Sequence, residues 1–216
     1  MTDSDRSRPL IELAVHELRT PLNVAAGSLR QLAAMPGLDA AERAVSERAL
    51  RACEQLERVT TQMRDWARLQ SEAAPVHRTA LTPALHQAAR DVEAARPGVH
   101  VVVDERHGDT LQVMAVSGQL ARALTGIIAA VARPVAAGSS IPVTTSGNGE
   151  HVSVQIGDTN GALHEALTFD MDGIGGLGFA LALAQQIITA SGGRAGLLLD
   201  AHGRVQGAVI ALLRQE

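Results

Sequence analysis

Aromatic side chains are almost absent from this sequence of 216 residues. Trp66, Phe169 and Phe179 are the only ones, and tyrosine does not occur. Aromatic residues bury the most apolar surface per side chain, so a core without them contains few large side chains that bury much surface. Because hydrophobic residues still make up 46% of the chain and many are alanine, we expect oligomerisation to supply part of the stability.

Disulfides, long apolar runs and an excess of positive charge are also missing. Cys53 is the single cysteine, which excludes an internal disulfide and a metal site built from several cysteines. No stretch approaches the roughly 20 apolar residues of a membrane-spanning helix, and residues 1–6 do not read as a signal peptide. A formal net charge of −4 gives no electrostatic basis for nucleic-acid binding. We therefore expect a cytoplasmic protein with no nucleic-acid partner and no membrane span.

Histidine is comparatively frequent, with eight in the chain. Seven of these residues show no paired spacing typical of a metal site, and we interpret them as surface or turn residues: His77, His86, His100, His107, His151, His164 and His202. The eighth, His16, stands in a motif of its own.

Residues 16–23 read His-Glu-Leu-Arg-Thr-Pro-Leu-Asn. Neutral imidazole is a nucleophile at physiological pH, and Pro21 removes one helical hydrogen bond, which predicts a kink beside the site. The eight residues closely resemble the phospho-acceptor box of bacterial sensor histidine kinases. The resemblance implies that His16 is phosphorylated on a ring nitrogen, whereas a lone histidine on a helix is usually an ordinary solvated residue. Glu17 is placed to hydrogen-bond the phosphate donor or acceptor group that lies in line with His16.

Glu17 and Thr20 also form the pattern Glu-x-x-Thr, which in the resembling family marks kinases that dephosphorylate their receivers. A hydroxyl one helical turn after His16 is placed to orient a water molecule at the phospho-aspartate of a receiver. Thr20 is equally well explained as a helix-surface residue without a role, and the sequence leaves both interpretations open.

Two long helices are predicted around this motif. Apolar residues alternate spacings of four and three, the period of a coiled-coil seam, at Ile11, Val15, Leu18, Leu22, Ala25, Leu29 and Leu32, and again at Val45, Ala49, Ala52, Leu56, Val59, Met63 and Trp66. The first helix is expected to begin near Pro9 and to end before Pro36. Asp39 is the expected N-cap of the second helix, and Glu42 completes a capping box.

The two helices are predicted to pair as an antiparallel hairpin, a domain over residues 1–72. One hairpin cannot cover its own apolar stripe, whereas two copies packed as a four-helix bundle can. We therefore expect a homodimer, and the resembling family also dimerises through this hairpin. The alternative is that both stripes pack on the C-terminal part of the chain.

Residues 80–216 are predicted to form a second domain, after a linker over residues 71–80 that loses the heptad pattern. Short β-branched runs alternate with helical segments, which predicts an α+β fold, an α/β sandwich with helices on one face of a mixed sheet. Thr82 and Ser117 are the expected caps of the first two helices, and Gly192-Gly193 is the expected end of the third. The predicted helices span about residues 82–95, 117–133 and 178–190, and the predicted strands 99–104, 111–115, 142–146, 151–156, 197–200 and 205–213.

The segment Gly175-Gly176-Leu177-Gly178-Phe179-Ala180 opens the last of these helices. A glycine loop before a helix presents backbone N–H groups to an anion. The segment looks like the last glycine box of the histidine-kinase ATP-binding domain, which has the element order just described. By this resemblance Gly176 and Gly178 contribute to nucleotide binding, although a glycine turn before an alanine-rich helix is more often structural.

Other positions depart from the family pattern. Ala130 stands where the resemblance places the magnesium-binding asparagine, and alanine has no oxygen ligand for magnesium. Asp158 aligns with the aspartate that recognises the adenine amino group, but Asn160 and Ala162 replace the two glycines that follow it. Residues 161–175 are too few for the usual lid over ATP. We expect no bound metal and at most weak ATP or ADP binding through Asp158, which is equally well interpreted as a solvated turn residue.

These features predict a two-component signalling protein, a histidine phosphotransferase that exchanges phosphate between His16 and response-regulator receivers. Phosphoryl transfer from ATP depends on positioning and on magnesium, so the departures predict that ATP is not used. Two alternatives stay open. One is an active sensor histidine kinase with a divergent ATP site. The other is a non-catalytic adaptor, although the intact acceptor box argues against an adaptor. The absence of a sensor module before residue 9 fits a stand-alone relay and a fragment equally well.

Overall fold

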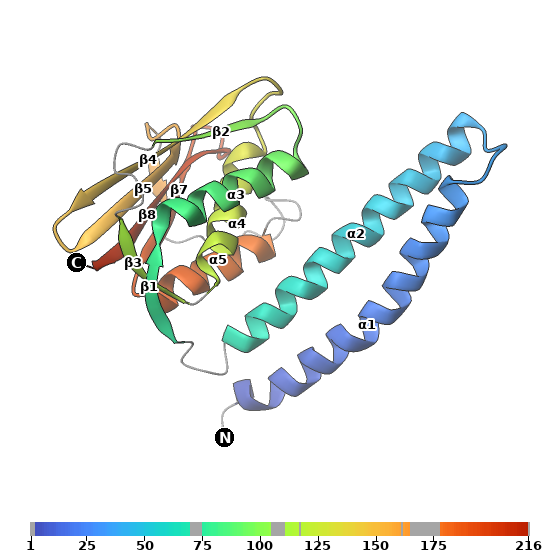
Figure 1. The fold of residues 1–216 in the computed structure, drawn as a ribbon, viewed down its shortest axis with the longest axis horizontal. Coiled ribbons are helices and arrows are strands. Elements are labelled where there is room, and N and C mark those ends of the chain that lie inside the picture. Colours follow the sequence, from blue (N-terminus) through green and yellow to red (C-terminus); the bar gives the residue numbers. More distant parts are fainter. Residues whose placement is uncertain are drawn as a thin grey trace. The chain divides into compact units, whose positions relative to one another are not determined.

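The computed structural model describes residues 3–69, 75–104, 111–116, 118–160, 162–164 and 178–215. The chain divides into two compact units, Met1–Glu72 and Ala73–Glu216. The described part of the first unit is helical, and the second unit combines helices with a sheet (Figure 1). None of the described helices has a stretch that is both long and apolar enough to cross a bilayer.

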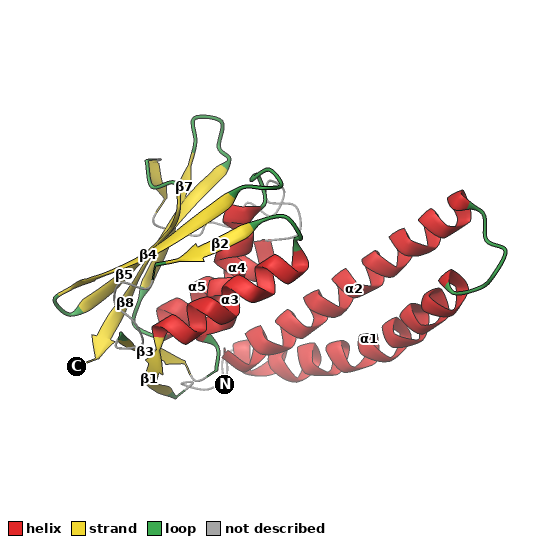
Figure 2. Cartoon of the chain, turned by 45° about the horizontal axis from the view of Figure 1, so that its top comes forward, coloured by secondary structure: helices red, strands yellow, loops and turns green. Residues whose placement is uncertain are grey.

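The first unit is a hairpin of α1 (Asp3–Ala33) and α2 (Ala40–Leu69). The expected start near Pro9 is wrong, because α1 already begins at Asp3. A sequence with acidic residues at positions 3 and 5 suits a helix N-terminus, where the helix dipole favours negative charge. The helix also continues through Pro21, and Figure 2 shows it curving along its length.

A tight turn joins the two helices and ends in the predicted capping box. The helix α1 ends at Ala33, before Pro36 as expected, and Gly37 takes the left-handed conformation at φ 103°. The Asp39 N–H donates to Glu42 Oε2 at 3.0 Å, and the Glu42 N–H donates to Asp39 Oδ1 at 2.8 Å. Both side chains thus satisfy backbone donors at the start of α2, which fixes where that helix begins.

The second unit is built on a mixed sheet of eight strands, counted over the described residues. These are β1 (Val76–Ala80), β2 (His100–Val103), β3 (Gln112–Val116), β4 (Ser140–Asn148), β5 (His151–Gly157), β6 (Ala162–His164), β7 (Arg194–Leu199) and β8 (Val205–Gln215). The strand order is β1-β3-β8-β5-β4-β2, with β7 beside β8 and β6 beside β7. The β2–β4 pair is parallel, and the other described pairs are antiparallel.

Three helices cover one face of this sheet: α3 (Leu81–Ala95), α4 (Leu120–Ala132) and α5 (Gly178–Ala190) (Figure 2). The helix α4 contacts both α3 and α5 as well as β5 and β8, so it forms the centre of the helical layer. Alternate residues of β5 and β8 are fully buried, as expected for a sheet with one face against helices: Val152, Val154, Ile156, Ala208, Ile210 and Leu212. The predicted sandwich fold is confirmed.

Two strands escaped the sequence prediction. The strand β1 occupies half of the expected linker and pairs along its length with β3, and β6 pairs with β7. Both are short strands whose partners lie far away in the sequence, so local periodicity gives no signal for them.

The predicted starts of two helices are also wrong. The helix α3 begins at Leu81, and its N-cap residue Ala80 makes no side-chain hydrogen bond, so Thr82 is not the cap. The Leu81 N–H instead donates to the Leu111 carbonyl at 3.0 Å, which satisfies a helix-end donor from outside the helix. The helix α4 begins at Leu120 after Gln119, and the expected cap Ser117 lies outside the described residues.

The predicted end of α5 is confirmed. Gly192 has a φ of 73°, a left-handed conformation that favours glycine. The Gly193 N–H donates to the Ile188 carbonyl at 2.9 Å, and the Gly192 N–H donates to Thr189 at 2.9 Å. This is the pattern of a Schellman cap, and it directs the chain from α5 straight into β7.

Candidate functional site

The acceptor motif lies within α1, in its described part. Glu17 and Thr20 are exposed to solvent. Position 16 lies one turn before Thr20 on the same face of the helix, because residues four apart are neighbours on a helix surface. His16 lies one position away from the apolar seam, so the sequence predicts that it stands on the exposed flank of the helix. Its side chain lies outside the described side chains, so this stays a prediction. The structure therefore brings positions 16 and 20 together on an open helix.

The two helices α1 and α2 are in extensive contact, and part of this contact is polar. Ala26 is the fully buried residue of α1 among its described side chains, and Ser46 and Thr60 are buried on α2. Ser46 Oγ donates to the Leu29 carbonyl at 3.3 Å, which links the two helices, whereas Thr60 Oγ1 donates within α2 to the Glu57 carbonyl at 2.9 Å. Small and hydroxyl side chains thus form the fully buried part of the hairpin, whereas Leu22, Ala25 and Leu29 of the predicted stripe are half-buried.

Much of that stripe remains exposed on the hairpin. Leu18 is 48% exposed on α1, and Val45 and Leu56 are 61% and 51% exposed on α2. Val24 and Leu32 add two more large apolar residues at 64% and 41%. Leaving several such residues in water is unfavourable, so the hairpin as described has an apolar surface that needs a cover.

The position expected to hold magnesium is part of the core. Ala130 is 2% exposed on α4, and its neighbours Ile127, Ile128 and Val131 are each 1% exposed or less. Magnesium needs oxygen ligands in octahedral geometry, and this helix face supplies apolar groups. Among the described residues, no cluster of three or more histidine, cysteine or acidic side chains is arranged to hold a metal. The side chain at position 130 therefore offers magnesium no oxygen ligand, and the expectation that no metal is bound stays a prediction.

Asp158 follows β5 directly and is exposed. Its carboxylate Oδ1 accepts two hydrogen bonds from Asn160, one from the backbone N–H at 3.0 Å and one from Nδ2 at 2.7 Å. The residue aligned with the adenine-recognising aspartate is thus engaged within its own turn. The sequence singles out Asp158 and the replacement at Asn160, but the hydrogen bond between them was not predicted. An aspartate two residues before a backbone donor is the usual signal of an Asx turn, and this signal was present.

The backbone around Asp158 is packed tightly against β8. The Asp158 N–H donates to the Gln206 carbonyl at 3.0 Å, and a Cβ added at Gly207 would lie 2.0 Å from the Asp158 carbonyl oxygen. Gly157 has a φ of 74°, and a Cβ there would lie 2.7 Å from Val131 Cγ1 on α4. These glycines allow the chain to pass between α4 and β8, so the position of Asp158 is fixed from both sides.

The glycine box is only partly described. Gly176 lies outside the described residues, and Gly178 is the first residue of α5. In the first turn of α5, the Ala180 carbonyl oxygen lies 3.1 Å from where a Cβ of Gly126 on α4 would be. Because Gly126 has no side chain, α4 and α5 can approach each other closely. This close packing is a structural reason for the small residues of α5. The nucleotide role inferred for Gly176 and Gly178 stays a prediction.

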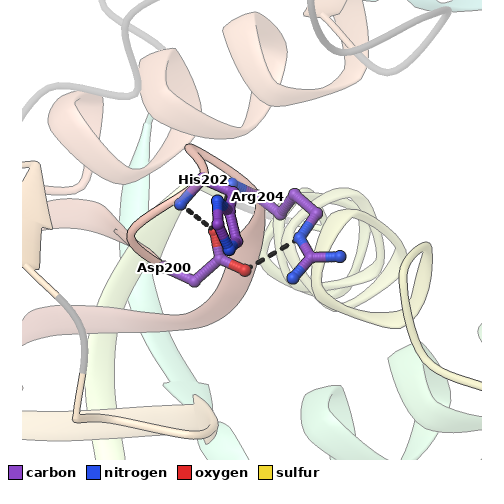
Figure 3. Close-up of polar contacts among 3 residues, drawn as sticks. All are labelled: Asp200, His202 and Arg204. Carbon is purple, nitrogen blue, oxygen red and sulfur yellow. Dashed lines mark hydrogen bonds and ion pairs between the residues drawn. The ribbon is translucent and has the colours of Figure 1, made fainter.

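A second carboxylate turn lies between β7 and β8 (Figure 3). Asp200 Oδ1 accepts the backbone N–H groups of His202 at 2.8 Å and Arg204 at 2.9 Å, and Oδ2 accepts Arg204 Nε at 2.8 Å. The hydrogen bond from the Arg204 backbone, together with the His202 N–H and the guanidinium, lowers the pKa of Asp200, although partial desolvation opposes the shift. Every partner lies within the turn, so its role is to close this hairpin.

Residues 10–72 match the family described as His Kinase A (phospho-acceptor) domain. A search of curated protein sequences finds no significant match. The matched segment contains His16, Glu17 and Thr20.

Similar folds occur among sensor kinases. Full-length ShkA, crystallised in complex with AMPPNP, superimposes with a TM-score of 0.66 at 21% identity over 96% of this chain. This chain spans 46% of the ShkA chain. The Acinetobacter baumannii histidine kinase AdeS gives a TM-score of 0.56 at 16% identity, over 93% of this chain and 98% of AdeS. The mycobacterial sensor histidine kinase MprB gives 0.52 at 20% identity, over 65% of this chain and 99% of MprB.

Proposed function

From its histidine-kinase core, a phospho-acceptor hairpin followed by an ATPase-like fold, we propose that this chain is a histidine phosphotransferase. It carries phosphate on His16 and exchanges it with the aspartate of a response-regulator receiver, without using ATP. The observation that supports this most is the match of residues 10–72 to a phospho-acceptor domain, with the whole box around His16. Two-component signalling is the setting in which such a domain works.

The chemistry of the exchange is balanced without a further reactant. An imidazole nitrogen of His16 attacks the phosphorus of the receiver's acyl phosphate, the bond from phosphorus to the aspartate oxygen breaks, and a phosphorus–nitrogen bond forms. The receiver carboxylate leaves as the anion, and the imidazole gives up its proton. Glu17 follows His16 directly and is exposed, so it is placed to hydrogen-bond the donor or acceptor group in line with His16. Because this helix surface is open, a receiver can approach it directly.

The second domain supports the absence of an ATP-dependent step. ATP transfer relies on magnesium to neutralise charge on the phosphates, and the buried Ala130 on α4 provides no ligand. Loss of one charge-stabilising group typically lowers a rate by about 10²–10³. The domain therefore serves the hairpin as a folded attachment rather than as a phosphate donor.

We also propose that the chain is a homodimer through its hairpin. Leu18, Val45 and Leu56 are exposed apolar residues of the hairpin. When two copies pack as a four-helix bundle, each hairpin covers the apolar surface of the other. His Kinase A domains typically dimerise, which supports the same arrangement.

The direct test is transfer from a phosphorylated receiver. The parent chain, His16→Gln and the matched control His77→Ala, which changes another exposed histidine, are each mixed with a receiver labelled on its aspartate. We expect acid-labile label on the parent and on His77→Ala, and none on His16→Gln. Label that persists on His16→Gln would show that a different residue is the acceptor.

The runner-up is an active histidine kinase that phosphorylates His16 from ATP through a divergent site. It is favoured by the similarity of the fold to sensor kinases, one of them crystallised with AMPPNP. Incubation with labelled ATP and magnesium separates the two proposals, since only the kinase labels His16 in the absence of any other protein.

A further inference from the structure

The strand β2 forms one end of the sheet. Among the described strands it pairs only with β4, in parallel, and α3 contacts it (Figure 2). The His100 N–H donates to the Ser139 carbonyl at 3.1 Å, and the Asp104 N–H donates to Val143 on β4 at 2.8 Å. Because a strand directs the N–H groups of successive residues to opposite sides, the Val101 N–H points away from β4. It is therefore a donor of the free edge of the sheet.

The side chain of Glu93 covers this donor. Glu93 lies in the last turn of α3 and is half-buried, and its Oε1 accepts the Val101 N–H at 2.7 Å. A hydrogen bond to a carboxylate is shorter and stronger than one between neutral groups. Inside a sheet the carbonyl of a neighbouring strand would accept this N–H. The Glu93 carboxylate thus occupies the place that the carbonyl of a further strand would take.

The strand that Glu93 covers is uncharged and apolar. Residues 99–103 read Val-His-Val-Val-Val, without an acidic residue, lysine, arginine or proline. Val102 is 56% exposed. Uncharged, β-branched segments at the edge of a sheet pair readily with further strands. Because these residues carry no net charge, two such edges can meet without repulsion between their side chains.

We propose that Glu93 blocks the pairing of β2 with β2 of a second copy of this chain. The carboxylate removes an edge donor that the second strand needs, and the blocked surface is the free edge of β2. An edge that meets its own copy forms a twofold interface, so removal of one side chain opens both halves of it. This role belongs to the second domain and depends neither on phosphate transfer nor on the hairpin.

The test compares the whole parent chain with Glu93→Ala, Glu93→Gln and Asp91→Ala. Glutamine keeps a side-chain oxygen for the Val101 N–H, and Asp91→Ala removes an exposed carboxylate from the same helix. Light scattering over a range of concentrations gives the mass of each chain. We expect the mass of Glu93→Ala to rise above that of the parent with concentration, and the other two variants to keep the parent mass.

Hydrogen exchange of the Val101 amide reports on the edge itself. A hydrogen bond to a charged group corresponds to at least about a tenfold change in an equilibrium constant. In dilute Glu93→Ala this amide should exchange at least about tenfold faster than in the parent. Its exchange should slow again as the concentration rises, because the second strand then accepts the N–H. The Val154 amide on β5, between two paired strands, should be unchanged and shows that the sheet is intact.

A second substitution separates edge pairing from a general loss of folding. Lysine on an edge strand opposes pairing, so Glu93→Ala combined with Val102→Lys should return to the parent mass. The proposal is wrong if Glu93→Ala keeps the parent mass, if Glu93→Gln associates as strongly as Glu93→Ala, or if Val102→Lys leaves the association unchanged. Transfer of phosphate to His16 tests the proposed function separately, and none of these outcomes bears on it.

Discussion

Asp39 and Glu42 hydrogen-bond each other's backbone N–H groups at the start of α2, at 2.8 and 3.0 Å. The pair replaces two helix-end hydrogen bonds that the helix cannot make for itself. It also stands at the turn of the hairpin, so the length and register of the acceptor domain depend on it.

Removal of this cap should destabilise the hairpin. We expect Asp39→Ala to lower the free energy of unfolding by about 1 kcal/mol, measured by urea unfolding followed by circular dichroism. Asp39→Ser keeps a side-chain acceptor at the same position and should retain most of the stability. Equal unfolding midpoints for the parent and Asp39→Ala would contradict the role of the cap.

The proposed dimer depends on the exposed apolar surface of the hairpin. Leu56→Glu should convert the dimer to a monomer, because an unpaired charge buried in an interface costs several kcal/mol. The neighbouring Gln55→Glu is the control, since Gln55 is exposed and bonds only Arg58 among its described hydrogen bonds. Light scattering gives the mass of each variant. A monomeric parent, or a Leu56→Glu dimer, would show that the stripe packs elsewhere.

Two glycines of the sheet, Gly207 on β8 and Gly147 on β4, should respond differently to a methyl group. A Cβ at Gly207 would lie 2.0 Å from the Asp158 carbonyl oxygen, whereas a Cβ at Gly147 would lie 3.5 Å from Arg214 Nη1. We expect Gly207→Ala to destabilise the second domain by about 1–3 kcal/mol through overpacking. Gly147→Ala should change stability by less than about 0.5 kcal/mol. Thermal unfolding curves of both variants make the comparison, and similar losses would argue against the close approach at Gly207.

The turn at Asp200 should respond to acid. The folded-state pKa of this carboxyl is held below its ordinary value of 3.8, so its contribution is complete above that value and is lost as pH falls through the folded-state pKa. Asp200→Asn should therefore melt at a lower temperature than the parent at neutral pH, and the two should converge well below pH 3.8. A difference that stays constant into acid would show that the carboxylate charge is not what stabilises the turn.

The sequence was informative where the contacts are local. The acceptor box, the Asp39–Glu42 cap and the cap at Gly192 each join residues within a few positions of one another, so their spacing carries the information. The pairing of β1 with β3 and the approach of Gly207 to Asp158 join distant segments and have no local pattern. The bond from Asn160 to Asp158 is local, but an exposed asparagine has several acceptors within reach, and only the geometry of the turn selects one.

In the proposed function, His16 receives phosphate from a receiver and not from ATP. Labelled ATP with magnesium is given to the chain alone, to the chain with an unrelated active kinase, and to the chain with that kinase and a receiver it phosphorylates. We predict acid-labile label on the chain only in the third mixture, and none there for His16→Gln. Strong His16-dependent labelling of the chain with ATP and magnesium alone would contradict the account and identify it as a working kinase.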